Sequence, residues 1–144
     1  MVKAKAIDLS KIILFYTLLG FLVLFALGAQ AQQPQLLKQG TFNNQSQRIS
    51  GGWAIVQQGN QTYLQLTNDF ATSSAPDLKV FLSPNSARSV NGRNATQGAL
   101  RVSRISSSGG QTFVLPQGVN INRFGSVVIH CEAYSKLWGA GDIR

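Results

Sequence analysis

The only cysteine and the only histidine of this 144-residue chain are neighbours, Cys131 and His130. These residue types can provide a redox thiol, a nucleophile activated by a base, or ligands for a metal or a prosthetic group. They lie in Phe124–Tyr134, a segment rich in β-branched and aromatic residues and free of proline, which predicts a strand. If the protein carries out redox chemistry, we expect it at this strand.

Strand geometry separates the two side chains. Successive side chains of a strand face opposite ways, so Cys131 is predicted to face inward with Val127 and Ile129, and His130 to face away. A Cys-His nucleophile pair or a shared metal would need a bulge or a second strand to turn one of them around. Adjacency in the sequence is therefore weak support for a catalytic dyad.

A lone cysteine cannot form an internal disulfide, so Cys131 is a free thiol, an intermolecular partner or a ligand. The structural alternative is a buried cysteine that packs as a small hydrophobic residue, and the pattern alone favours this alternative. A working thiol needs a nearby cation and some access to solvent. Arg123 and Lys136 are the nearest cations in the sequence.

Other catalytic chemistry has little support in the sequence, which contains no G-x-S-x-G, H-E-x-x-H, C-x-x-C or phosphate-binding glycine loop. One histidine and one cysteine cannot supply the three or four protein ligands of a zinc site, so no metal site is predicted. A conventional enzyme is accordingly disfavoured. The residues kept as supporting candidates around the thiol are Asp69, Asp77, Tyr134 and Trp138.

The N-terminus has the pattern of a secretory signal peptide. Three lysines precede the uncharged run Ile12–Gly28, and the small-x-small sequence Ala29–Ala31 follows it. The run is long for a signal core and at the lower limit of a membrane span, so an uncleaved anchor is the alternative. We predict a signal peptide or anchor over 1–31, a linker over 32–39 and one β domain over 40–144. The domain is expected to be exported, to the periplasm, the extracellular space or the cell surface.

Basic residues outnumber acidic ones, with a formal net charge of +8. Removing Lys3, Lys5, Lys11 and Asp8 with the signal leaves +6. Such a charge favours contact with anionic lipids, polysaccharides or nucleic acid. Export and the lack of aromatic residues among the scattered arginines argue against nucleic acid. Solvated charges on loops and strand edges are the favoured interpretation, and contact of the basic loops with an anionic surface is the alternative.

Short apolar runs recur about every ten residues, separated by Gly, Asn, Pro and Ser. This predicts an all-β fold, an antiparallel β-sandwich or barrel of short strands, preceded by the hydrophobic N-terminal helix. Pro84–Gln97 is expected to be a long loop. The other predicted elements are a polar edge strand within Gly40–Ser50, a hairpin of Trp53–Gln57 and Thr62–Thr67, a strand over Leu78–Ser83, a second hairpin of Ala99–Ile105 and Gln111–Leu115, and a final short strand or irregular segment over Leu137–Ile143.

Several short motifs between Gly40 and Ile143 resemble those of one known family. They are Gly40-x-Phe42, Asp69-Phe70, Pro76–Ser83, Gly98-x-Leu100, Gly110–Pro116 and Phe124–Cys131. Together they are similar to the electron-transfer DM-thirteen domain, a small extracytoplasmic module found alone in bacteria and beside DOMON domains in eukaryotes.

The resemblance implies an all-β fold, a role in electron transfer, and a redox role for the cysteine that follows the Val-Val-Ile strand. In this chain that residue is Cys131, acting as a bare thiol or through a bound group such as haem, with His130 as a further cofactor-binding candidate. Similar domains often have a histidine where this chain has Gln47-Arg48, and the C-terminal pattern fits only in part. A bare thiol is therefore favoured over haem.

Two hypotheses follow from the sequence. The first is an exported redox module that works through Cys131, shielded by Tyr134 and Trp138, with an unidentified redox partner or envelope component. The second is a structural or adhesive module of the envelope or cell surface, in which Cys131 fills the core and basic loops contact anionic polymers.

Overall fold

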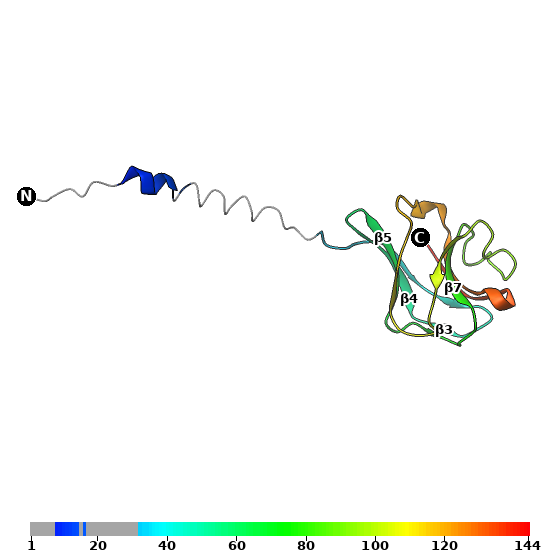
Figure 1. Ribbon diagram of the computed structural model, residues 1–144. Coiled ribbons are helices and arrows are strands. Elements are labelled where there is room, and N and C mark those ends of the chain that lie inside the picture. Colours follow the sequence, from blue (N-terminus) through cyan, green and yellow to red (C-terminus); the bar gives the residue numbers. More distant parts are fainter. Residues whose placement is uncertain (1–7, 15, 17–31) are drawn as a thin grey trace, which may run out of the picture. The chain divides into compact units, whose positions relative to one another are not determined.

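Antiparallel pairing of short strands organises the chain from Gln35 onward (Figure 1). The computed structural model describes residues 8–14, 16 and 32–144. A four-stranded sheet has the order β1 (Gln35–Thr41), β4 (Gly52–Gln58), β5 (Gln61–Leu66), β9 (Gln111–Val114). A five-stranded sheet has the order β2 (Asn43–Asn44), β11 (Lys136–Asp142), β10 (Ser126–Cys131), β7 (Leu78–Ser83), β8 (Leu100–Arg104). The short strands β3 (Ile49–Ser50) and β6 (Ala71–Thr72) pair with each other.

The hairpin β4–β5 follows directly from its sequence. Gly59 adopts φ +59° at the turn, a conformation that glycine reaches without steric cost. Trp53 is paired with Leu66 and Ile55 with Leu64, and all four side chains are buried. The predicted hairpin is confirmed, and its alternating apolar residues form one wall of the core.

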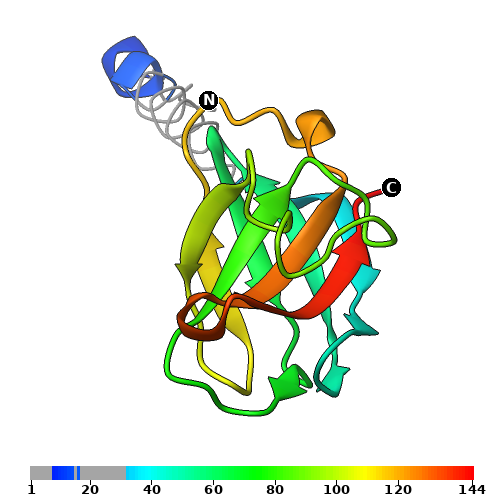
Figure 2. The same ribbon diagram turned by 90° about the vertical axis from the view of Figure 1, so that its right-hand side faces the viewer.

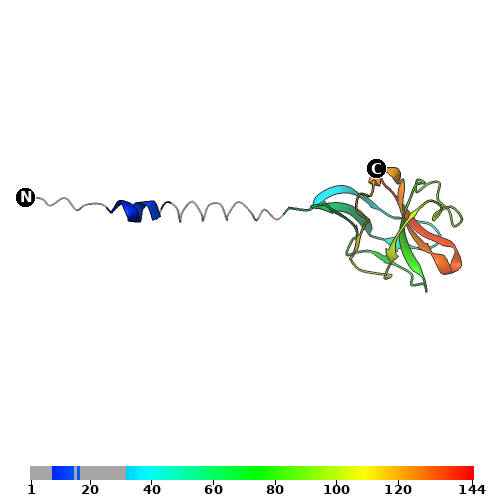
Figure 3. The same cartoon turned by 45° about the horizontal axis from the view of Figure 1, so that its top comes forward.

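The two main sheets enclose one apolar core. Figure 3 shows the strands around it, with β1 and β4 in cyan to green on one side and β10 in orange on the other. The core is built from alternate residues of β4, β5, β7 and β10. The expectation of an antiparallel, mostly β fold is therefore confirmed for the described residues. Besides strands, the part from residue 32 onward has two 3-10 turns, η1 (Ile121–Arg123) and η2 (Glu132–Tyr134).

Strand β10 is buried on both faces. It pairs with β7 and β11, and every residue from Ser126 to Cys131 is buried. A second apolar cluster covers its outer face, where the loop 84–99 lies against the sheet. This cluster consists of Phe81, Ala87, Val90, Ala95, Val128, Leu137 and Ala140, with Ala99 packed against it.

Three sequence-based expectations need correction. The strands β8 and β9 exist, but they do not form the predicted hairpin, because β8 pairs with β7 and β9 with β5. The residues that connect β8 and β9 form hydrogen bonds with other segments: Ile105 N donates to Leu78 O at 3.0 Å, and Gly109 N donates to Phe70 O at 2.9 Å.

The other two corrections concern element boundaries. Residues 35–39 of the predicted linker belong to β1, which pairs with β4 from Gln35 to Thr41. The central strand ends at Cys131 rather than continuing to Tyr134, because the backbone turns through η2 and Ser135 adopts φ +48°.

The N-terminal segment is described only in part. Residues 9–14 and 16 are helical, whereas most of the predicted signal peptide or anchor over 1–31 lies outside the described residues. Among the residues that are described, no helix combines the length and the apolar character needed to cross a membrane. Residues 33–144 form a compact unit by themselves.

Candidate functional site

Cys131 is the last residue of β10 and is fully buried. Its backbone lies between Leu78 on β7 and Lys136 on β11. Its side chain belongs to the apolar core cluster that also contains Ile129 and Trp138, and the thiol is free. Cys131 therefore faces inward, as the strand alternation predicts.

His130 faces the other side of the sheet and is 3% exposed. Its ring packs edge-on against Phe81, with centroids 6.1 Å apart, and its Nε2 lies 3.3 Å from the carbonyl oxygen of Gly92. The Nδ1 atom is buried and has no hydrogen-bond partner among the described residues. Because the two side chains lie on opposite faces, Cys131 and His130 form no dyad and do not converge on one ligand.

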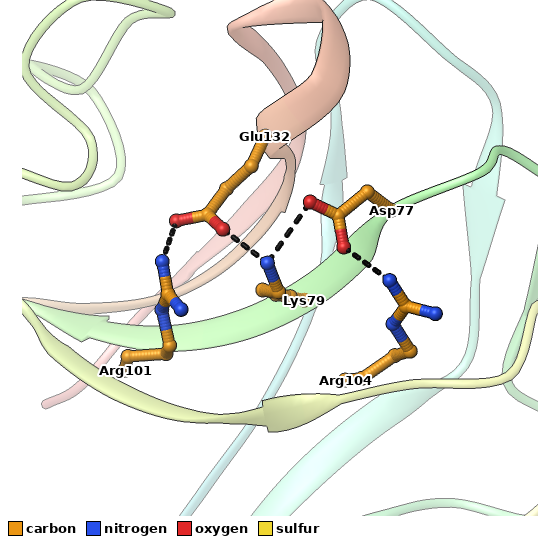
Figure 4. A network of polar contacts seen from close by, with 5 residues as sticks. All are labelled: Asp77, Lys79, Arg101, Arg104 and Glu132. Atoms are coloured by element: carbon orange, nitrogen blue, oxygen red, sulfur yellow. Dashed lines mark hydrogen bonds and ion pairs between the residues drawn. The ribbon is translucent and has the colours of Figure 1, made fainter.

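Five charged side chains gather beside the end of β10, and we call them the ion-pair cluster (Figure 4). The cluster consists of Asp77, Lys79, Arg101, Arg104 and Glu132. Lys79 Nζ lies between the two carboxylates, 2.9 Å from Asp77 Oδ2 and in contact with Glu132 Oε2. The outer carboxylate oxygens are held by the arginines of β8: Arg104 lies 2.8 Å from Asp77 Oδ1, and Arg101 contacts Glu132 Oε1.

The cluster shifts the protonation of its members toward their charged forms. The hydrogen bond from Lys79, followed by that from Arg104, lowers the pKa of Asp77. Lys79, and to a smaller extent Arg101, lowers the pKa of Glu132 against the opposing effect of desolvation. The hydrogen bonds to Glu132 and Asp77 raise the pKa of Lys79. Glu132 is thus an ionised ion-pair partner at neutral pH and a poor proton acceptor for the neighbouring thiol.

The ion-pair cluster also holds the turn that follows Cys131. Turn η2 has no buried side chain, so packing does little to fix it. Instead, Glu132 N donates to Asp77 O at 3.1 Å, and the Glu132 carboxylate contacts Lys79 and Arg101. Glu132 therefore anchors the first residue of η2 to β7 and β8.

The other supporting candidates lie in different surroundings. Trp138 is buried in the same core cluster as Cys131, and its Nε1 donates to Ser73 O at 3.3 Å. Tyr134 is 58% exposed, in η2. Asp69 is exposed, and within the described residues its carboxylate makes no ion pair or hydrogen bond. The structure thus brings Asp77 and Trp138 near the end of β10, and leaves Asp69 outside the ion-pair cluster.

The described residues do not fit a haem or a metal. Among them, no group of three or more His, Cys, Asp and Glu side chains could hold a metal ion. An axial haem ligand must open onto a cavity that holds the macrocycle. Cys131 and His130 are buried, and neither lines any of the five principal clefts.

Sequence reasoning identified Asp77 but missed its cluster partners Lys79, Arg101, Arg104 and Glu132. One signal was present, since Asp77 and Lys79 are two residues apart and so share a face at the start of a predicted strand. Lys79 and Glu132 are 53 positions apart, and only the pairing of β7 with β10 brings them together.

Comparison with known proteins gives one match. The family model described as Electron transfer DM13 matches residues 41–143, which include every strand from β2 to β11 and the ion-pair cluster. None of the curated proteins matches, and none of the solved structures does. Because the matched region covers well over half of the chain, this protein belongs to the Electron transfer DM13 family.

Proposed function

We propose that this chain is an exported electron-transfer module in which the Cys131 thiol is the redox group. The family match over 41–143 is the observation that carries the proposal. Cys131 is the only cysteine of the chain and ends the central strand of the larger sheet. The lysines, apolar run and Ala-x-Ala sequence of the N-terminus support export, with membrane anchoring as the alternative.

The chemistry open to a single thiol is exchange with an external disulfide. The Cys131 thiol loses its proton to water, and the thiolate attacks one sulfur of the disulfide. A new S–S bond forms as the old one breaks, and the second sulfur leaves as a thiolate with the electron pair. This step requires direct contact with the partner, whereas Cys131 is fully buried in the closed structure.

Access to Cys131 is proposed to come from local opening of η2. This turn follows the thiol directly and buries no side chain, so its opening exposes little apolar surface. The contacts that resist opening are the ion pairs of Glu132 with Lys79 and Arg101 and the bond from Glu132 N to Asp77 O. In this proposal, Glu132 acts as a latch that sets how often the thiol is exposed.

The alkylation rate of Cys131 at pH 7 tests whether the thiol becomes accessible in the folded chain and whether Glu132 limits that access. The folded full chain is expected to react more slowly than the unfolded chain, but faster than global unfolding allows. Glu132→Gln is expected to raise the folded-state rate several-fold, because it weakens two ion pairs that hold the closed state. Arg104→Gln, which leaves the Glu132 contacts intact, is the matched control.

Two results would overturn the redox proposal. One is an alkylation rate equal to the rate of global unfolding in wild type and in Glu132→Gln alike. The other is failure of the folded chain to react with an aromatic disulfide reagent that the unfolded chain reduces at one equivalent. Cys131→Ala serves as the blank for both assays.

The second candidate function is a structural or adhesive surface module. It is favoured by the complete burial of Cys131 in apolar surroundings and by exposed basic side chains that make no ion pair within the described residues. From residue 32 onward, those side chains are Arg48, Arg88, Arg93, Arg123 and Lys136. Retention by anionic vesicles at low salt, lost at high salt and absent on neutral vesicles, would support it, because screening weakens exposed contacts.

A further inference from the structure

A cleft with several polar side chains lies at one end of the four-stranded sheet, beside the β4–β5 turn, and shares no lining residue with the ion-pair cluster. Its volume is about 520 Å³, within the usual range for small-molecule sites. Its walls come from β1, from the β4–β5 turn and the adjoining ends of these strands, and from residues 118–122, which end with the first two residues of η1. It shares no residue with Cys131 or with the ion-pair cluster, so it is independent of the proposed redox site.

The cleft arises where the apolar rows of the β4–β5 hairpin end. Trp53 and Ile55 face the core on β4, and the next residue of that row is Gln57. Gln57 is paired with Thr62, which continues the inward row of Leu64 on β5. Two polar side chains therefore point into the space between the sheets where apolar ones would close it.

The segment after β9 covers this end without filling it. Leu115 N donates to Thr62 O at 2.9 Å, and Val119 N donates to Pro116 O at 3.2 Å. Ile121 then packs into the core from η1. Figure 2 shows this segment in orange, crossing the upper end of the strands. The cleft is thus bounded by a strand hairpin and a turn that are both tied to the core.

The polar side chains of the cleft have hydrogen-bonding capacity to spare. Within the described residues, the side chains of Lys38, Asn60, Thr62 and Asn122 make no hydrogen bond or ion pair. Gln57 uses its Nε2 to donate to Gly59 O at 3.1 Å, which leaves its Oε1 free to accept. The ion-pair cluster differs in this respect, because its charged groups satisfy one another.

We propose that this cleft binds an acidic oligosaccharide, one built from uronic acid units. Amide and hydroxyl side chains each offer a donor and an acceptor, which matches the neighbouring hydroxyls of a sugar ring. Lys38 is the single charged residue of the lining, and no carboxylate of the lining neutralises it. Its ammonium group therefore favours a ligand that places one carboxylate within hydrogen-bonding distance of Lys38. Val119, Ile121 and Leu37 provide the aliphatic contact for the C–H face of the ring.

The test compares two matched trimers on the full chain. A trimer of galacturonic acid and a neutral trimer of galactose are titrated, with affinity measured by calorimetry and location by backbone amide shifts. The acidic trimer is expected to bind about tenfold or more tightly than the neutral one, because its carboxylate meets Lys38. The shifts are expected at Asn60, Thr62 and Asn122.

Four variants sharpen this test. Lys38→Gln is expected to lower the affinity for the acidic trimer to that for the neutral trimer. Asn60→Ala is expected to weaken both trimers several-fold, because it removes hydrogen bonds that both make. Lys136→Gln, an exposed lysine outside this cleft, is the matched control and should change neither affinity. Cys131→Ala should also change neither, which separates this site from the redox proposal.

Three outcomes would overturn the proposal. They are the absence of binding of either trimer at millimolar concentration, equal affinity of wild type for the two trimers, and tighter binding of a glutamate tripeptide than of the acidic trimer. The last result would assign the cleft to acidic peptides instead.

Discussion

The two faces of β10 are both buried, but by different kinds of structure. The inner face, with Val127, Ile129 and Cys131, is enclosed between the two sheets. The outer face, with Val128 and His130, lies beneath the loop 84–99. Hydrogen-bonded strands on both sheets hold the inner cover in place, whereas the outer cover is a segment without regular structure.

The outer cover depends on a few specific contacts. Ala87, Val90 and Ala95 are the buried apolar side chains of the loop, and all three are small. Asp142 Oδ1 accepts a hydrogen bond from Ala87 N at 2.7 Å and ties the loop to β11. Equal burial on the two faces therefore does not imply equal resistance to opening, since a loop with few apolar contacts opens at lower cost than a sheet.

Two matched substitutions of valine by alanine, one on each face of β10, test this difference directly. Val127→Ala removes two methyl groups from the inner face and is expected to cost about 2–3 kcal/mol of unfolding free energy, because the surrounding strands cannot close the cavity. Val128→Ala removes the same groups from the outer face, where the loop can settle inward, and should cost about 1 kcal/mol less. Urea unfolding measures both values, and equal losses would contradict the comparison.

Gly92 provides a way to lift the outer cover alone. A Cβ at this position would lie 2.7 Å from Ser135 O, so Gly92→Ala must displace the loop from the segment Ser135–Leu137, which follows η2 and begins β11. We expect Gly92→Ala to lower the free energy of unfolding by about 2 kcal/mol, which is typical of overpacking at a tight contact. Hydrogen exchange should accelerate more in 84–99 than in β4 and β5, whose amides are protected up to the free energy of global unfolding. Gln97→Ala, an exposed change in the same loop, is the control.

The apolar setting of the inner face predicts an order among Cys131 variants. Cys131→Ser places a hydroxyl in the core cluster and is expected to be about 1–2 kcal/mol less stable than Cys131→Ala, because the hydroxyl is desolvated without a compensating partner. Thermal unfolding of the two variants checks this. A serine variant as stable as the alanine variant would show that Cys131 has a polar neighbour.

The ion-pair cluster predicts the smallest effect, one that depends on pH. The pKa values of Asp77 and Glu132 are lowered in the folded state. Their contribution to folding stability is therefore fully present above the ordinary pKa values of 3.8 and 4.5, and it is lost as the pH falls through the lowered pKa values. The pKa of Lys79 is raised in the folded state, so its contribution to folding stability is present below the ordinary pKa of 10.5 and is lost only as the pH rises above it.

Wild type should therefore lose stability between neutral pH and pH 3 more steeply than Glu132→Gln, which has one fewer carboxylate to protonate. Urea midpoints at pH 7 and pH 3 measure the difference. Parallel pH dependences in the two proteins would mean that Glu132 contributes nothing through its charge.

Residue alternation carried much of the fold prediction. Leu64 and Leu66 on β5 lie two positions apart, as do Val127 and Ile129 on β10, and this period predicts which face of a strand is buried whatever the partner strand is. The glycine at position 59 marked the β4–β5 turn for a similar local reason. The inward direction of Cys131 follows from the same period.

The candidate site was less accessible to such reasoning. The failed pairing of β8 with β9 shows why: their Gly- and Ser-rich connection permits a hairpin, but the choice of partner depends on β7 and β5, which lie far away in the sequence. The ion-pair cluster and the polar cleft depend on those same long-range pairings.

Local sequence features predicted the β4–β5 hairpin, the strand β7, the inward direction of the single thiol and the family, because period, turn residues and motifs are local properties of the chain. Three features depend on packing between distant segments: Lys79 contacts Glu132, the loop 84–99 covers His130, and Gln57 and Thr62 line a cleft. These features join residues distant in sequence, and their geometry exists only after the two sheets have packed around one core.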